Sequence, residues 1–180
     1  MVDTQRTVAQ LISTLADNTT GDITPQDARD LLVTLEPGHA QIFLTAPAVT
    51  SIATQSAFQK LSGTTALATT PPTRWSMPAD NQLQCDADAR RVVKVTASFS
   101  VQTAVNSQTL LFRFAKNGTT ISDTEINRFF VLSTENAAVT LVATLFMDPG
   151  DNLELWGAND TSTANFTVTR LVMAVIDGAT

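Results

Sequence analysis

The stretch AVTLVATLFMDPGDNLELWGA, residues 138–158, decides the fold class of this chain. Its first part, Ala138–Met147, is rich in apolar and β-branched residues, and its last part, Asn152–Ala158, carries a Leu-x-Leu pattern. Between them lies Asp-Pro-Gly-Asp, and proline and glycine are typical of tight turns. Two short apolar runs joined by such a turn predict a pair of antiparallel strands.

Apolar residues at every second position, as the Leu-x-Leu pattern shows, recur over most of the chain. A second turn signal, Lys116-Asn117-Gly118-Thr119, is typical of a β-hairpin. Many short strands separated by such turns predict a mainly β protein, an antiparallel sandwich or barrel. We expect strands at the following ranges: Ala40–Thr45, Ser56–Lys60, Gln82–Cys85, Arg91–Gln102, Thr109–Lys116, Thr119–Ile121, Glu125–Leu132, Ala138–Met147, Asn152–Ala158 and Phe166–Ile176.

Two late strands, Val139–Met147 and Phe166–Ile176, are largely apolar on both faces. An antiparallel strand with one face in water should alternate apolar and polar residues, so a second face must be covered as well. We favour a neighbouring subunit as the cover, and the N-terminal segment is the alternative. The candidate residues of a trimer interface are Val142, Phe146, Leu171, Met173 and Val175.

The first 36 residues predict two short helices. Thr24 fits the N-cap of the second helix, Pro25 fits its first position, and Pro37-Gly38 ends it. Each helix carries an apolar stripe at the spacing i, i+3, i+4, i+7. The stripes supply the candidate contacts with a capsid or a neighbouring subunit: Val8, Leu11, Ile12, Leu15, Leu31, Leu32 and Leu35.

Two helices of about ten residues each are too short to be stable by themselves. We therefore expect them to pack on the β domain, on neighbouring subunits or on another protein, and the sequence does not choose among these. The predicted organisation is a helical segment at residues 1–37 and a β domain at residues 38–180.

Composition limits the classes of function. The net charge of the 180 residues is −6, and Arg90-Arg91 is the only adjacent basic pair, so we expect no nucleic-acid partner. Charged residues make up only 16%, below the usual share of about 25%, which is consistent with surface hidden in an assembly. The start lacks the pattern of a signal peptide, and no apolar run is long enough to span a membrane. We expect folding in the cytoplasm of the producing cell and no membrane partner.

Candidates for chemistry are few. A catalytic triad has one possible base, because His39 is the only histidine, and we expect no enzymatic activity, no metal and no cofactor. Asp148 and Asp151 flank a turn, and calcium binding is the less favoured alternative to a purely structural role. Trp75 and Trp156 are expected to pack or to contact a subunit, with stacking on a sugar as the alternative.

Three segments in order resemble the trimeric jelly roll of the tumour necrosis factor (TNF) class, in the version found in tailed-bacteriophage virion proteins. They are RVVKVTASFS (91–100), LFRFAKNGTTI (111–121) and MDPGDNLELW (147–156). The leader TVAQLISTLADNTTGDITPQDARDL (7–31) is similar to leaders of phage structural proteins that carry such a domain. Together the leader and the jelly-roll part cover nearly the whole chain.

The resemblance implies a homotrimer with its inner sheets around a threefold axis. It also implies a virion role as a capsid decoration (cement) protein, made in the host cytoplasm and bound to the major capsid protein at the capsid surface. The alternative is a receptor- or glycan-binding fibre-tip module. The chain departs from the class in having no tyrosine, and it has no long shaft, which argues against a complete tail fibre.

Overall fold

The computed structural model describes residues 37–178 and five isolated earlier positions, Gln10, Ser13, Pro25, Asp27 and Leu31. These five positions have helical backbone, but they define no helix with bounds. The two predicted N-terminal helices otherwise lie outside the described residues, and they stay a prediction. The division between residues 37 and 38 also stays a prediction.

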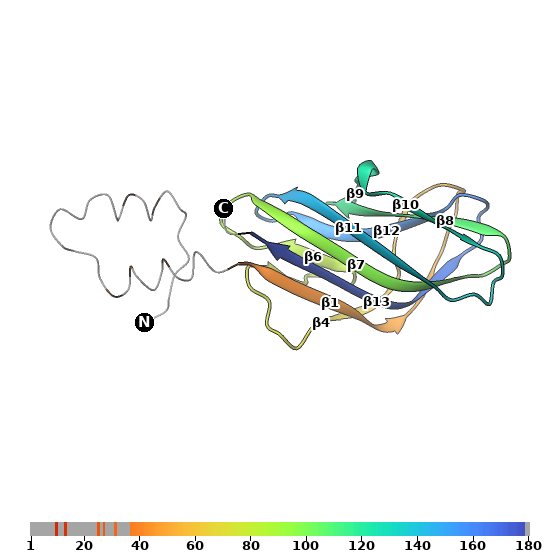
Figure 1. Cartoon of the computed structure of the whole chain (residues 1–180), viewed down its shortest axis with the longest axis horizontal. Coiled ribbons are helices and arrows are strands. Elements are labelled where there is room, and N and C mark those ends of the chain that lie inside the picture. The colour runs from red at the N-terminus through yellow and green to blue at the C-terminus, as the bar shows by residue number, and fades with distance from the viewer. Residues whose placement is uncertain are drawn as a thin grey trace.

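The described residues form a sandwich of two antiparallel sheets (Figure 1). In the first sheet the strand order is β11 (Ala137–Met147), β7 (Arg91–Thr103), β13 (Phe166–Asp177), β1 (His39–Pro47) and β4 (Gly63–Leu67), and β2 (Val49–Thr50) pairs with β13. In the second sheet the order is β10 (Ile126–Phe130), β8 (Gln108–Lys116), β12 (Asn152–Asn159), β6 (Gln82–Cys85) and β5 (Trp75–Ser76), with β3 (Gln59–Lys60) on β12 and β9 (Thr119–Thr120) on β8. The predicted mainly β antiparallel sandwich is thus confirmed.

The two predicted turns join strands as expected. At Asn117 and Gly118 the φ angles are 52° and 76°, as two-residue hairpin turns require, and the turn joins β8 to β9. In the second turn the amide of Asp151 donates to the carbonyl oxygen of Asp148 at 3.0 Å, and Gly150 has a φ of 85°. Glycine adopts such positive angles without steric cost.

The predicted strand at Ser56–Lys60 is wrong over most of its length. Ser56 has a φ of 61° in a turn, and only Gln59–Lys60 is a strand. The strand at Gly63–Leu67 was not predicted, because Gly-Thr-Thr-Ala-Leu lacks large apolar residues at alternate positions. The predicted strand at Glu125–Leu132 is shorter in the structure, where it is β10 (Ile126–Phe130). A 3₁₀ turn, η1 (Ser122–Thr124), precedes it, and Glu125 is the C-cap of this turn.

Three phenylalanines join the sheets through the core. Phe112 on β8 lies edge-on to Phe99 on β7, with ring centroids 4.8 Å apart, and edge-on to Phe166 on β13 at 5.8 Å. Such edge-to-face pairs contribute roughly 0.5–1.5 kcal/mol beyond the burial of their area. The cluster holds the second sheet against the middle of the first.

Gly157 on β12 supplies the space for this cluster. A Cβ at this position would lie 2.7 Å from Cζ of Phe166 and 3.1 Å from Cδ1 of Phe112. We expect Gly157→Ala to lower the free energy of unfolding by about 1–3 kcal/mol, because added atoms in a packed core displace their neighbours. Chemical denaturation at matched protein concentration measures the loss. Gly178→Ala is the control, because its Cβ would meet no atom within 4 Å. Equal stability of the two variants would contradict the prediction.

Candidate functional site

The outer face of the first sheet, directed away from the core, carries most of the exposed large apolar side chains of the described residues. Val142 is 59% exposed and Phe146 is 63% exposed, and both lie on β11. Neighbouring strands add further large apolar side chains to the same face. On the four long strands of this sheet, the exposed large apolar residues of the outer face are Phe43, Val92, Val142, Phe146, Val172 and Ile176.

The strand pairing explains how these side chains are arranged. Phe43 on β1 lies opposite Val172 on β13, and Phe146 on β11 lies opposite Val92 on β7. Between the two phenylalanines the face carries mainly small residues: Thr96, Ser98, Ser100, Ala138, Thr140 and Ala174. The outer face is therefore recessed in its middle, where the side chains are small, and it carries large apolar side chains, two of them aromatic, at its borders.

The predicted interface residues lie on opposite sides of this sheet. Val142 and Phe146 lie on the outer face, whereas Leu171, Met173 and Val175 are buried in the core between the sheets. The register of β13 against β7 shifts between Val168 and Arg170, which marks a β-bulge. A bulge adds a residue to one strand and reverses its alternation beyond that point. The assignment of the three β13 residues to an interface is therefore corrected, and Val172 and Ile176 occupy the outer face instead.

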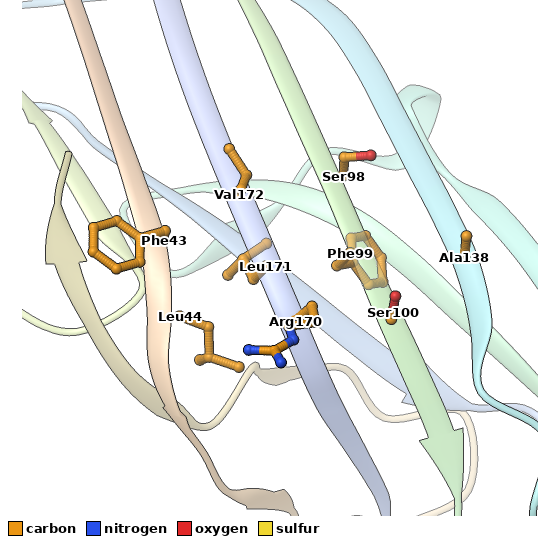
Figure 2. Close-up of a pocket in the computed structure, with 9 residues that line it drawn as sticks. All are labelled: Phe43, Leu44, Ser98, Phe99, Ser100, Ala138, Arg170, Leu171 and Val172. Carbon is orange, nitrogen blue, oxygen red and sulfur yellow. The ribbon is translucent and has the colours of Figure 1, made fainter. Parts of the chain in front are cut away.

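A hollow of about 420 Å³ lies in the outer face, across β1, β13, β7 and β11 (Figure 2). Its lining includes Phe43, Val172 and Arg170, together with the hydroxyl-bearing Ser98 and Ser100. Figure 2 shows the guanidinium of Arg170 extending from β13 towards β1, beside Leu44. Arg170 is exposed, and it has no hydrogen bond or ion pair with any described residue.

The charge on the outer face has one sign. The outward-directed residues of β1, β4, β7, β11 and β13 include Lys94 and Arg170 but no aspartate or glutamate. Lys94 also has no ion pair within the described part of the chain. The outer face therefore combines apolar side chains with two unpaired cations, in a chain whose net charge is −6.

The remaining candidate residues have structural surroundings. Trp156 is half-buried, and its Nε1 donates to Oε2 of Glu154 at 3.0 Å, while Glu154 also pairs with Lys60 at 3.1 Å. Trp75 is buried in the core, and His39 is half-buried at the start of β1. Among the seven N-terminal contact candidates, Leu31 is half-buried and the other six lie outside the described residues. Burial raises the pKa of the Cys85 thiol, which favours its protonated form.

The carboxylates of the Asp148–Asp151 turn are occupied by donors of the protein itself. Arg90 donates two hydrogen bonds to Asp148, at 2.7 and 3.0 Å, and lowers the pKa of that carboxyl. Asp151 accepts from Lys116 at 2.9 Å and from Asn117 at 2.6 Å. In the described part of the chain, no group of three His, Cys, Asp or Glu side chains could hold a metal ion. The same residues contain no helix long and apolar enough to cross a membrane.

Comparison with known proteins identifies the fold. No family model matches the chain, and no curated protein matches its sequence. Among solved structures, Eiger TNF from S. frugiperda is 15% identical with a TM-score of 0.50, and the match covers 79% of this chain and 93% of that one. Murine APRIL is 10% identical with a TM-score of 0.53, covering 77% and 98%. The vertex protein of PRD1 is 14% identical with a TM-score of 0.49, covering 78% and 96%.

The first two of these structures establish the class of the fold. The β domain of this chain is a TNF-like jelly roll, as the sequence resemblance predicted. At 10–15% identity the similarity is one of architecture and does not extend to the side chains of the outer face.

The Asp148–Asp151 turn predicts a specific pH dependence of stability. Burial by itself raises the pKa of Asp151, but hydrogen bonds from the Asp148 amide, Lys116 and Asn117 outweigh it and hold the pKa below its usual 3.8. A carboxyl whose pKa is lower in the folded state stabilises the fold above the unfolded pKa and loses this contribution as the pH falls. We expect Asp151→Asn to lower the melting temperature at pH 7, and the difference from wild type to narrow at pH 3.

Thermal unfolding monitored by circular dichroism at the two pH values tests this expectation. Asp88→Asn is the matched control, because Asp88 is exposed and pairs with none of the described residues. If the melting temperatures of wild type and Asp151→Asn differ by the same amount at pH 7 and pH 3, the effect comes from the changed side-chain packing and not from the lost charge.

Proposed function

We propose that this protein is a non-enzymatic structural protein that assembles as a homotrimer through the outer face of the first sheet. The observation that carries the proposal is the concentration of six exposed large apolar side chains on the four long strands of that one face. Contiguous apolar surface of this kind marks an interaction site in soluble proteins. The resemblance to the TNF class supports the choice of this face, because it implies that one sheet of each subunit, the inner sheet, faces a threefold axis. In this proposal the first sheet is that inner sheet, and its outer face is the side turned towards the axis.

The proposed role is that of a capsid decoration protein of a tailed bacteriophage, located at the capsid surface of the virion. It is supported by the resemblance of the leader at residues 7–31 and of the β domain to phage structural proteins. In this proposal the N-terminal segment, residues 1–37, contacts the major capsid protein or the neighbouring subunit. Three such segments delivered by one rigid trimer bind with avidity, so that no single contact needs to be strong.

The solution mass of the full chain tests the trimer. We expect a mass three times that of the 19.2 kDa chain, measured by light scattering after size exclusion. Val142→Asp should shift the mass towards that of one chain, because it places a carboxylate among the apolar side chains of the proposed contact. Val105→Asp is the control, because Val105 is 46% exposed but lies in the loop between β7 and β8, outside the strands of the outer face.

Either of two results would contradict the trimer. A wild-type chain that is monomeric at micromolar concentration would show that the outer face needs no partner. A trimer that resists Val142→Asp as well as Val105→Asp would place the contact elsewhere on the molecule.

Removal of residues 1–36 tests the attachment role. We expect the shortened chain to retain the β-sheet signal in circular dichroism and to lose binding to capsids purified without this protein. The physical reason is that the predicted apolar stripes at Leu11, Leu15, Leu31 and Leu35 are removed while the described core is kept. Co-sedimentation with such capsids measures the binding. Undiminished co-sedimentation of the shortened chain would assign attachment to the β domain.

A further inference from the structure

The sign of the charge on the outer face restricts how copies of this chain can meet. Lys94 and Arg170 lie among its apolar side chains, and the face has no acidic residue to pair with them. Two outer faces stacked on each other by a twofold axis would bury four cations without a counter-charge. Because removing unpaired charges from water is costly, this isologous contact is disfavoured. A different surface, one that carries a carboxylate, must cover the face.

Such a surface lies at the open edge of the sandwich. β11 ends the first sheet and β10 ends the second, and Figure 1 shows η1 projecting beside them. A hollow of about 740 Å³ at this edge is lined by Asp123 and Ile121 together with Leu145 and Phe146 of β11. Apolar side chains and an exposed carboxylate thus occur together at the edge.

Asp123 is the carboxylate at this edge that is left without a partner. Glu125 pairs with Arg113 at 2.6 Å, and Glu135 pairs with Arg128 at 3.0 Å. Asp123 is exposed and has no hydrogen bond or ion pair with any described residue. An unpaired acid on the edge therefore matches an unpaired base on the outer face.

We propose that the edge of one copy covers the outer face of the next copy, with Asp123 of one subunit entering the hollow of its neighbour and pairing with Arg170. The contact rests on the proposed homotrimer and specifies its arrangement. It is heterologous, since two different surfaces meet, and repetition of such a contact around an axis closes a ring. The hollow is lined by the apolar Phe43, Val172 and Leu44 beside Arg170, which suits the pairing of the apolar Ile121 with the carboxylate of Asp123 on the edge.

The long planar guanidinium of Arg170 suits this role. It binds a carboxylate with two parallel hydrogen bonds, which fixes orientation as well as attraction. The hydroxyl groups of Ser98 and Ser100 line the same hollow and offer further donors. Lys94 does not line this hollow, so it serves as the comparison cation.

Charge reversal in the full chain tests the pairing. We expect Arg170→Asp and Asp123→Arg each to raise the concentration at which the trimer dissociates by roughly tenfold or more, because each places like charges together. The double variant should restore dissociation to within about threefold of wild type, because the pair is re-formed with its signs exchanged. Sedimentation velocity over a dilution series measures, for each of the three variants, the midpoint of dissociation, which is the protein concentration at which half of the trimer has dissociated.

Two controls separate this pair from general charge effects. Asp88→Arg changes the net charge as Asp123→Arg does, but on the loop before β7, and it should leave the midpoint unchanged. Lys94→Asp combined with Asp123→Arg should not restore the trimer. The neutral variants Arg170→Gln and Asp123→Asn supply the same cycle with milder changes, and their combined effect should be smaller than the sum of the single effects.

The outcomes distinguish this pairing from the trimer itself. A wild-type trimer that dissociates with Val142→Asp but shows no rescue in the double charge reversal would overturn the pairing and leave the trimer standing. Single reversals that do not weaken the trimer would also overturn it. A monomeric wild-type chain would overturn both.

Discussion

The edge-to-face packing of Phe112 against Phe99 and Phe166 is the contact on which the rest of the structure depends. It joins the second sheet to β7 and β13, the two strands at the centre of the first sheet. Because the core lies on one side of the first sheet, the described chain leaves the other side without a cover. The way the sandwich closes therefore leaves this face exposed, and its apolar character comes from side chains such as Phe43, Val142 and Phe146.

The bulge in β13 sets the chemistry of that face. By reversing the alternation after Val168, it buries Leu171, Met173 and Val175 and brings Arg170 to the outside. A regular strand that placed Val168 in the core would also have kept Arg170 inside, where a guanidinium without a partner is costly. One irregular residue thus produces both a complete core and a cationic hollow.

Several charged groups elsewhere in the described residues are paired within the chain. Asp148 with Arg90, Asp151 with Lys116 and Glu154 with Lys60 stabilise turns and strands. The unpaired charges that matter here lie on the outer face and on the adjoining edge, and they have opposite signs. Assembly of identical subunits through these two surfaces accounts for the low overall share of charged residues better than a site for small-molecule chemistry does.

The sequence by itself determined the sandwich, because turn residues and a period of two are local signals, and it indicated that Val142 and Phe146 lie outside the core. It also carried the order of segments that resembles the TNF class. The tertiary structure decided which face of β13 is buried, since a bulge is defined by the partner strand β7 and leaves no mark in a single strand's pattern. It alone placed Arg170 in a hollow and Asp123 at an edge. Both positions depend on the packing of strands that are distant in the sequence, and the local pattern of residues does not show such packing.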